Sequence, residues 1–311
     1  MTAPRGIVVR SCAIAVPDKV VTNDDLAASL DTSNEWIVER TGIRERRIGG
    51  TTSELAIEAG RRAIEGAGLS ATDIEVLVLA TTTADAIAPA TASTVQHALG
   101  IQGGAFDVNA GCSGFMYGLV ISAGLASLGT DRILLVGADT LSGITDWDDR
   151  TIAVLVGDGA GAVVIEAVEG PGNLLSHNLH SDGSLRHLLY CDHGGALYMD
   201  GKEIFRRAVR VVVESAEQAL RDAGVTADDI AMLVPHQANL RIIQAACQRL
   251  GIPEERTAVV IDRYGNTSSA SIPLALHDVV DSQRVRPGDL LLLSGFGAGM
   301  SWASAVLRWG S

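Results

Sequence analysis

The chain repeats part of its own pattern at an interval of 156 residues. Residues 56–80 (AIEAGRRAIEGAGLSATDIEVLVLA) align with residues 212–236 (VVESAEQALRDAGVTADDIAMLVPH). Each copy has apolar residues at helical spacing, then a glycine that ends the helix (Gly68 or Gly224), a short turn and an apolar strand. A repeat this long is not that of a short-period solenoid, so it predicts a duplicated α/β unit.

The match continues, at nearly the same interval, into two turns of the chain. Gly111 and Cys112 in the first half fall opposite Gly265 and Asn266 in the second, and an uncharged helical stretch follows each pair. We expect pseudo-twofold symmetry to bring both helix N-termini to one central cleft. Cys112 and Asn266 would then lie close together, although 154 residues separate them. The alternative is a chance similarity between two ordinary αβ units.

The predicted fold class is therefore α/β, with two duplicated αβαβα halves. A length of 311 residues suits about two domains. Residues 1–165 form the first predicted half, with Cys112, and residues 166–311 form the second, with His236 and Asn266. Because 47% of the residues are hydrophobic and only 4% are aromatic, we expect small aliphatic side chains to fill the core.

Cys112 lies where a predicted strand turns into a predicted helix. The apolar stretch 105–108 leads into a turn with Gly111 and Gly114, and an uncharged helical stretch covers 113–128. Unpaired backbone N–H groups and the helix dipole at such an N-terminus favour a thiolate. Glycine on either side lets a reacting group approach the sulfur. The alternative is a packing role, since free cysteines are often core residues.

Three other segments at predicted strand ends suit a reaction site. His236 ends the second-half strand in VPHQANLRII (234–243), and ligands bind at strand ends in α/β sheets. Asn266 alone is only a turn residue. The loop SGFGAGMSW (294–302) joins two predicted strands; it is expected to direct a backbone N–H at an oxyanion, and the alternative is a tight hairpin with no such role. Cysteine, histidine and asparagine in one glycine-lined cleft fit acyl-thioester chemistry.

Charge and cysteine content disfavour several classes of function. The net charge of −13 argues against non-specific nucleic-acid binding. Arginines nevertheless cluster around 40–47, 206–210 and 241, where they suit phosphates or an acidic partner. The cysteines form no CxxC pair, which is typical of a reducing cytosol; they are at positions 12, 112, 191 and 247.

Neither a secretory signal nor a membrane span is expected. The N-terminal stretch MTAPRGIVVRSCAIAVP lacks a long apolar region and contains proline. The uncharged stretches 108–130 and 290–307 are interrupted by glycine, serine or asparagine, so we expect them to be buried in a packed core. We therefore expect a cytoplasmic protein.

The residues and their order resemble the β-ketoacyl-acyl carrier protein synthase III family of the thiolase fold. The matching segments span nearly the whole chain in the family's order: DTSNEWIVERTGIRERR (31–47), DVNAGCSGF (107–115), VGDGAGA (156–162), VPHQANLRI (234–242), GNTSSASIP (265–273) and GFGAGMSW (295–302). The resemblance implies decarboxylative Claisen condensation of an acyl-CoA starter with malonyl-acyl carrier protein. The product would be a 3-oxoacyl-carrier that initiates fatty-acid or polyketide synthesis. A homodimer without a cofactor is also implied.

The resemblance assigns the catalytic roles. Cys112 would be the nucleophile that accepts the acyl group. His236 and Asn266 would hydrogen-bond the malonyl thioester carbonyl and stabilise the enolate formed as CO2 leaves. The backbone N–H groups of Cys112 and Ala298 would bind the oxyanion. The family usually has glycine at the latter position, but Ala298 keeps the N–H.

The resemblance also implies substrate contacts. The CoA adenine would lie between Trp36 and Arg150 with Thr32 nearby, and Arg40 would face the pyrophosphate. From the residues themselves, Thr32 and Glu35 are expected to form a capping box that opens a short helix presenting Trp36; a core position is the alternative for Trp36. The implied pantetheine-tunnel residues are Gly201, Phe205 and Asn239, and the implied carrier-protein contacts are Arg206 and Arg241.

The implied acyl pocket contains Ala88, Leu141 and Val156. Many relatives have a bulky residue before Pro89, where this chain has Ala88, and some have an aromatic at Val156. We therefore expect a starter longer or more branched than acetyl. The segment 181–201 looks shorter than in common relatives by roughly ten residues. Its histidines and cysteine have no zinc spacing, so no metal is expected.

Four alternatives stay open. A specialised relative in secondary metabolism would select an unusual starter, or transfer the acyl group to oxygen or nitrogen without condensation. A type III polyketide synthase shares the Cys-His-Asn set, but the arginine-rich rim and short chain disfavour it. The duplicated halves and the Trp36–Arg150 pair disfavour a cysteine hydrolase. A Rossmann-type nucleotide binder would use VGDGAGA, which lacks the G-x-G-x-x-G setting.

Overall fold

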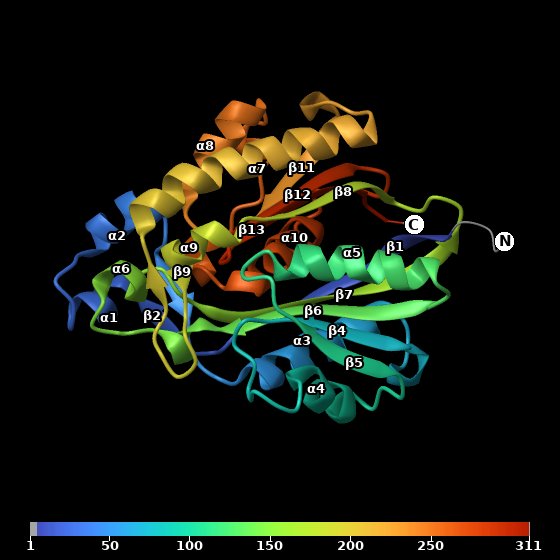
Figure 1. The fold of residues 1–311 in the computed structure, drawn as a ribbon, viewed down its shortest axis with the longest axis horizontal. Coiled ribbons are helices and arrows are strands. Elements are labelled where there is room, and N and C mark those ends of the chain that lie inside the picture. The colour runs from blue at the N-terminus through green and yellow to red at the C-terminus, as the bar shows by residue number, and fades with distance from the viewer. Residues whose placement is uncertain (1–4, 311) are drawn as a thin grey trace.

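The computed structural model describes residues 5–310, which form five layers in the order helix, sheet, helix, sheet, helix (Figure 1). Two helices cover the outer face of each sheet, and two more lie between the sheets. The outer helices are α3 (Thr52–Gly66) and α4 (Thr91–Leu99) on the first sheet, and α7 (Gly201–Ala223) and α8 (Leu240–Leu250) on the second. The central helices are α5 (Gly114–Ser127) and α10 (Ser271–Asp281).

The first sheet has five strands in the order β1-β7-β6-β4-β5. Strand β4 is parallel to β5 and β6, whereas β7 is antiparallel to β6 and β1. The apolar run 77–80 of β4 is completely buried because helices cover both faces of the sheet. The strands are β1 (Arg5–Ala15), β4 (Val76–Ala80), β5 (Gly104–Val108), β6 (Arg132–Thr140) and β7 (Asp158–Glu169).

The second sheet has four strands in the order β8-β13-β12-β11, which corresponds to β1-β7-β6-β4 of the first sheet. Strands β11 and β12 are parallel, and β13 is antiparallel to β12 and β8. The strands are β8 (Leu174–Ser181), β11 (Ile230–Pro235), β12 (Leu290–Gly297) and β13 (Ser301–Arg308). The predicted α/β fold with two similar halves is confirmed. The predicted boundary after residue 165 falls inside β7, and the exact division remains a prediction.

The turns that connect the outer helix to the next strand are built alike in the two halves. In the first half, the Ser70 N–H donates to the Asp73 carboxylate at 2.8 Å. In the second, the Thr226 N–H donates to the Asp229 carboxylate, also at 2.8 Å. These bonds lower the pKa of both aspartates. The repeat seen in the sequence therefore extends to the hydrogen bonds of the turns.

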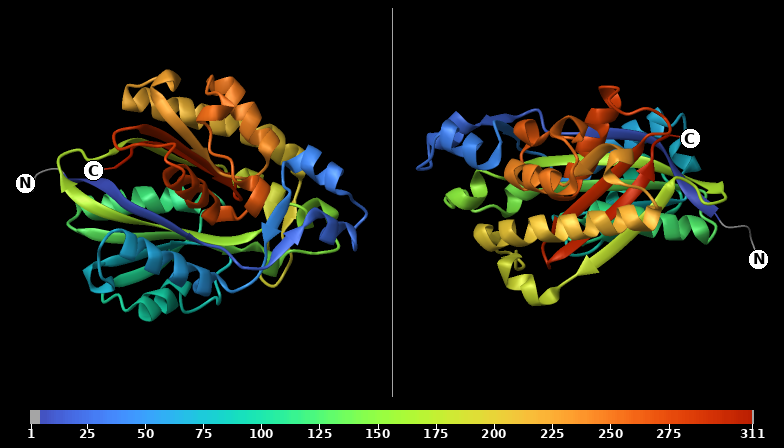
Figure 2. Two further views of the ribbon diagram at one scale, coloured as in Figure 1. Left: turned by 180° about the vertical axis from the view of Figure 1, so that it is seen from behind. Right: turned by 90° about the horizontal axis from the view of Figure 1, so that it is seen from above.

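Smaller elements gather at the end of the molecule opposite both termini (Figures 1 and 2). Two short strands pair there, and four short helices pack around them. The strands are β2 (Val20–Thr22) and β3 (Glu45–Arg47), and the helices are α1 (Asn23–Ala27), α2 (Asn34–Thr41), α6 (Arg150–Ala153) and α9 (Ile261–Tyr264). A separate hairpin pairs β9 (Leu189–Tyr190) with β10 (Tyr198–Met199).

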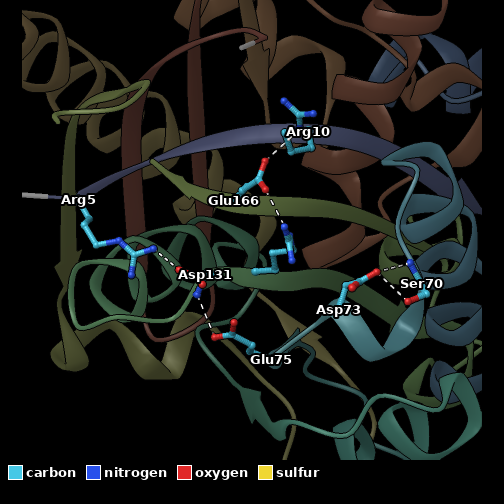
Figure 3. Close-up of polar contacts among 8 residues, drawn as sticks. Arg5, Arg10, Ser70, Asp73, Glu75, Asp131 and Glu166 are labelled. Carbon is cyan, nitrogen blue, oxygen red and sulfur yellow. Dashed lines mark hydrogen bonds and ion pairs between the residues drawn. The ribbon is translucent and has the colours of Figure 1, made fainter. Parts of the chain in front are cut away.

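A polar network joins the strands of the first sheet where β4 and β6 begin (Figure 3). Glu166 of β7 accepts from Arg132 at 3.3 Å, and the Asp131 N–H donates to Glu75 at 2.9 Å. Asp131 also pairs with Arg5. Most of these side chains are partly exposed, so their pairing contributes little to stability. Cys112 follows the opposite end of the parallel strands, away from this network.

The uncharged stretches singled out in the sequence are parts of the packed layers. The stretch 108–130 contains α5, and the stretch 290–307 contains β12 and most of β13. Within residues 5–310, none of the helices combines the length and the apolar character needed to cross a bilayer.

Candidate active site

Cys112 lies at the N-terminal end of α5. The helix is capped by Ser113, so the thiol comes one residue before the cap. Gly111 has a φ of +57°, and a Cβ at this position would lie 2.7 Å from the backbone N of Ala298. Glycine is required because of both the left-handed backbone and this close approach. The turn therefore holds Cys112 against the loop that follows β12.

A cavity of about 520 Å³ borders Cys112. Asn266 and Ala298 line the same cavity, whereas His236 is not among its lining residues. Much of the remaining wall is apolar and includes Leu141, Ile144, Ile152, Val156, Leu189 and Met199. The thiol thus faces a mainly apolar chamber, which suits the hydrocarbon part of an acyl group.

Asn266 is fixed by backbone bonds to the segment before β7. Its N–H donates to the Leu155 carbonyl at 2.8 Å, and its carbonyl accepts from the Gly157 N–H at 2.9 Å. The side-chain Oδ1 accepts from the Ser268 N–H at 2.9 Å. Because oxygen and nitrogen lie on opposite sides of a planar amide, the NH2 group points away from this bond. Asn266 is therefore oriented to donate hydrogen bonds.

His236 follows β11 and is 3% exposed. Its backbone N–H donates to the Ser294 carbonyl at 2.8 Å, and Nδ1 lies 2.6 Å from the Ser271 Oγ. The ring packs edge-on against Phe296, with 5.3 Å between the ring centroids. Burial lowers the pKa of His236 to about 3, so the imidazole is neutral at neutral pH.

The segment 266–271 contacts each part of the predicted catalytic set. Asn266 begins the segment, and Ser268 lines the cavity together with Cys112. Ser271 forms the bond to the His236 ring. One short stretch between α9 and α10 therefore connects residues from both halves of the molecule.

Asp139 fixes this segment to the first sheet. The carboxylate is fully buried in β6 and accepts from the Ser269 N–H at 2.9 Å. It also accepts from the Thr82 N–H at 2.7 Å. The Ser269 hydroxyl in turn donates to the Gly111 carbonyl at 3.2 Å. These bonds link the Cys112 turn to the Asn266 turn.

The electrostatic environment of the Cys112 thiol is mixed. Burial raises the pKa of this thiol to about 12, and the charge of Asp139 acts in the same direction. The side chain of Ser268 lowers the pKa of the thiol. Within residues 5–310 the Ser268 hydroxyl has no partner at ordinary hydrogen-bond geometry, yet it lies close enough to the sulfur to affect this pKa. The N-terminal end of α5 also favours the thiolate.

Cys112 and Ala298 both line the cavity, and the two turns that carry them pack closely together. A Cβ on Gly297 would lie 2.3 Å from the Cys112 N, and a Cβ on Gly111 would lie 2.7 Å from the Ala298 N. These two glycines therefore allow the turn before α5 to pack directly on the turn after β12. The binding of an oxyanion by these two amides remains a prediction.

Trp36 is flanked by two arginines. The guanidinium carbon of Arg40 lies 5.4 Å from the indole centroid, and that of Arg150 lies 4.9 Å from it. Arg150 also donates to the Asp31 carbonyl. Thr32, the next residue, has a buried Oγ1 without a partner within residues 5–310. The residues predicted to hold the adenine end of CoA thus form one cluster.

The capping box predicted for Thr32 and Glu35 is wrong. Helix α2 is capped by Ser33, whose Oγ accepts from the Trp36 N–H at 3.2 Å. Ser33 has the extended backbone of an N-cap, with φ −144° and ψ 161°. The sequence offers two adjacent hydroxyls, and the path of the chain from α1 selects the second.

The predicted tunnel and carrier residues lie near the starts of α7 and α8. Asn239 caps α8 by accepting from the Arg241 N–H at 2.9 Å, and it donates to the Arg40 carbonyl at 3.0 Å. The Arg241 guanidinium lies over the Phe205 ring, 5.7 Å from its centroid. These contacts connect α2, α7 and α8 into one rim.

Some of the other predicted substrate residues line the cavity and some do not. Leu141 and Val156 line the cavity beside Cys112. Ala88 is exposed and is not among the lining residues of this single chain. Gly201 is the first residue of α7, and Arg206 in the next turn pairs with Glu203 at 2.6 Å.

The segment 181–201 folds as a short helical turn (Gly183–Leu188) followed by the β9–β10 hairpin. The rings of Tyr190 and Tyr198 pack with 5.2 Å between centroids. Across the part of the chain that the structure describes, no group of three or more His, Cys, Asp or Glu is placed to hold a metal ion. The hairpin instead contributes Leu189 and Met199 to the cavity wall.

Three polar residues of the site were missed in the sequence. Ser268 and Ser271 belong to the run TSSAS (267–271) after Asn266, and Asp139 ends the strand VGAD. A hydroxyl-rich run at the start of an otherwise apolar helix is a sequence signal that could have indicated these polar site residues. The sequence pattern of this run predicts only the beginning of an uncharged helix.

Family models and curated relatives that match this chain all describe the same enzyme family. Two family models match, described as 3-oxoacyl-[acyl-carrier-protein] synthase III over residues 106–183 and as the C-terminal part of the same enzyme over residues 220–309. A curated β-ketoacyl-[acyl-carrier-protein] synthase III from Erythrobacter litoralis is 49% identical, covering 97% of this chain and 98% of the relative.

Solved structures agree with this match. The crystal structure of 3-oxoacyl-[acyl-carrier-protein] synthase III from Aquifex aeolicus superposes with a TM-score of 0.96 at 41% identity, covering 98% of this chain and all of the other. The priming β-ketosynthase of a polyketide biosynthetic pathway superposes with a TM-score of 0.95 at 37% identity, covering 100% of this chain and 98% of the other.

Proposed function

The chain belongs to the β-ketoacyl-acyl carrier protein synthase III family, and on that premise we propose how its own residues perform the family's reaction. It is an acyltransferase that condenses an acyl-CoA with malonyl-acyl carrier protein and thereby initiates fatty-acid synthesis. One observation carries the assignment of the site: Cys112 and Asn266, from turns 154 residues apart, line one largely apolar cavity.

The first step loads the acyl group on Cys112. The thiolate attacks the thioester carbonyl of acyl-CoA, the bond from carbon to the CoA sulfur breaks, and CoA leaves as its thiolate. The N-terminal end of α5 supports the attacking anion. The apolar wall that includes Leu141 and Val156 then receives the hydrocarbon chain.

The second step generates the carbon nucleophile. The malonyl carboxylate leaves as CO2, and its electron pair passes to the thioester enolate. Asn266 donates through Nδ2, because its oxygen is already bonded to the Ser268 N–H. We assign the proton of neutral His236 to Nε2: the Ser271 Oγ already accepts from the Gln237 N–H at 3.3 Å, so its own hydrogen is free to be donated to Nδ1. A neutral imidazole donor stabilises the enolate without needing to lose a proton.

The third step joins the two acyl groups. The enolate carbon attacks the Cys112 thioester, a carbon–carbon bond forms, and the bond to sulfur breaks to return the thiolate. The oxyanion formed on the way is bound by the N–H groups of Cys112 and Ala298. Their position is supported by the close packing of Gly111 and Gly297. One such donor lowers the barrier by about 3 kcal/mol.

Substrate recognition is assigned to the rim. Trp36 and Arg150 would bind the adenine, with Arg40 near the pyrophosphate and Thr32 beside them. Phe205, Asn239 and Gly201 would follow the pantetheine. Arg206 and Arg241 would contact the acidic carrier protein. The guanidinium groups of Arg40 and Arg150 lie near the indole ring of Trp36, which supports this cluster as a stacking site for a planar base.

We propose a homodimer in the cytoplasm. Strand β5 is the edge of its sheet, and the Ile87 side chain, in the segment between β4 and α4, is 89% exposed. An unpaired strand edge and an exposed large apolar residue each suit contact with a second copy. Ala88 would then contribute to the partner's acyl pocket rather than to its own. A reducing compartment would keep the Cys112 thiol free.

A second candidate is the priming of a polyketide with a starter longer or more branched than acetyl. The full-length similarity to a priming β-ketosynthase supports it. The chemistry at Cys112, His236 and Asn266 would be the same. Acyl transfer to oxygen or nitrogen would differ, because no CO2 would be released.

The test of the main proposal is acyl loading with a panel of radiolabelled acyl-CoAs, from acetyl to branched and long chains. The label should remain on the Cys112 peptide, and malonyl-acyl carrier protein should then convert it to a 3-oxoacyl product with release of CO2. The Cys112→Ala variant should retain no label. Loading that survives this substitution would disprove the assignment, and loading without CO2 release would favour the transfer reaction.

A further inference from the structure

Ser268 combines three features that the assigned reaction does not use. Its side chain is buried, with 1% exposure, and it lines the cavity together with Cys112. Within residues 5–310, its Oγ is one of three buried side-chain hydroxyl oxygens without a hydrogen-bond partner; the other two belong to Thr32 and Thr267. A buried hydroxyl without a partner costs free energy, so an unpaired one at a reaction cavity points to a ligand or to a reacting group.

The backbone of Ser268 is also strained. Its φ is +51°, and Gln283 is the other non-glycine residue with positive φ in the part of the chain that the structure describes. An L-residue other than glycine, asparagine or aspartate rarely has this conformation, and the cost persists only where surroundings impose it. Here the bond from the Ser268 N–H to the Asn266 Oδ1 fixes the turn. Serine at this position therefore keeps a Cβ and a hydroxyl at a site where glycine would fit without strain.

The charged groups around the Cys112 sulfur do not favour its thiolate. Asp139 lies behind the Cys112 turn and disfavours a thiolate, and burial disfavours it more strongly. His236 is neutral, so it supplies no cation to pair with the sulfur. The other titratable residues on the cavity wall are Tyr117, Arg186, Tyr190 and Cys191. Arg186 is the cation among them, and it is already paired with the Asp192 carboxylate at 2.7 Å. The thiolate must therefore be stabilised largely by dipoles, which are the α5 N-terminus and any hydroxyl aimed at the sulfur.

We propose that Ser268 is a further catalytic residue, whose hydroxyl donates a hydrogen bond to the Cys112 sulfur and stabilises its thiolate. When Cys112 is acylated, the sulfur loses its charge and the bond weakens. When the condensation returns the thiolate, the bond forms again. This inference concerns the nucleophile of the proposed function, but it needs no assumption about which acyl group is loaded.

The experiment measures the rate at which iodoacetamide alkylates Cys112 between pH 5 and 10, by mass spectrometry of the Cys112 peptide. The main variant is Ser268→Gly, because glycine accepts the positive φ and retains the N–H that bonds Asn266. The matched control is Thr267→Val, which removes the neighbouring hydroxyl. That hydroxyl is equally buried and has no partner within residues 5–310, but Thr267 does not line the cavity.

Ser268→Gly should slow alkylation by about tenfold at each pH below the midpoint of the profile, which is the effect of a thiol pKa raised by about one unit. Ser268→Ala should show the same shift, although it keeps the Cβ and the strained backbone of the parent. Thr267→Val should alkylate within about twofold of the parent at every pH. The proposal is wrong if the Ser268→Gly profile overlays that of the parent, or if Thr267→Val moves the profile equally. Normal alkylation without acyl-CoA loading would instead contradict the proposed function alone.

Discussion

The turn that leads to Cys112 and the turn that leads to Asn266 occupy matching places in the two halves, but the chain reaches them by different routes. In the first half, β5 pairs with β4 over its whole length, and α5 starts at Gly114. In the second half, the strand that would match β5 is reduced to one bridge between Leu233 and Thr257. Helix α9 then intervenes before Asn266.

The difference separates two chemical tasks. The short first route places the sulfur directly at a helix N-terminus, where the backbone stabilises negative charge. The longer second route fixes Asn266 by backbone bonds to Leu155 and Gly157, and fixes its amide by the bond to Ser268. The first turn therefore favours an anion, and the second directs a neutral donor. The duplicated fold provides two equivalent positions without requiring equivalent chemistry.

The largest expected effect tests this division of tasks. Asn266→Asp keeps the oxygen that accepts from the Ser268 N–H but removes the NH2 donors. CO2 release from malonyl-acyl carrier protein should fall by about 10²–10³-fold. Acyl loading of Cys112 should remain within a few-fold of the parent. Equal loss of both steps would show that the two turns do not have separate roles.

The next effect concerns the glycine in the second turn. Gly265 has φ +67° and ψ −159°, and a Cβ there would lie 2.8 Å from the Leu155 carbonyl oxygen. Gly265→Ala should lower the free energy of unfolding by about 3 kcal/mol, because backbone strain and overlap act together. Gly68→Ala is the control, since its φ is +70° but no atom lies within 4 Å of the added Cβ. Urea denaturation should give a loss of only about 1 kcal/mol for the control.

Acid stability tests the neutral imidazole beside the second turn. Burial lowers the pKa of folded His236 from 6.5 to about 3, so the unfolded chain binds the proton more readily. The resulting stability is complete above about pH 6.5 and is lost as the pH falls towards 3. Between pH 7 and pH 5 the parent should lose about 2 kcal/mol more than His236→Gln in urea denaturation. Parallel losses would mean that His236 titrates normally in the folded protein.

The smallest expected effect concerns the rim of the first half. Trp36→Leu removes the ring that Arg40 and Arg150 flank. The KM for acyl-CoA should rise about tenfold while kcat changes little, because the adenine contact is remote from the reacting carbon. An acyl thioester of N-acetylcysteamine, which lacks the adenine, should show no change. A KM increase for both substrates would place the role of Trp36 in the fold rather than in recognition.

Much of this arrangement was accessible from the sequence because it rests on local patterns. The repeat predicted two similar halves, and the Gly111-Cys112 and Gly265-Asn266 pairs predicted two matching turns. The prediction for α2 was wrong by one residue, since adjacent hydroxyls at Thr32 and Ser33 carry the same signal. The part played by Ser271 could not be predicted, because its bond to His236 joins residues 35 positions apart, on either side of helices α8 and α9.

What the sequence determined on its own was the order of helices and strands, the duplication and the candidate nucleophile, since periodicity, glycine placement and helix starts act over a few residues. The tertiary structure alone decided which atoms face the sulfur. Gly111 meets Ala298, Ser269 meets Asp139, and Ser268 adopts a strained turn at the cavity. Such pairings depend on how two sheets and their central helices pack, and close packing is a property of the whole chain rather than of any segment.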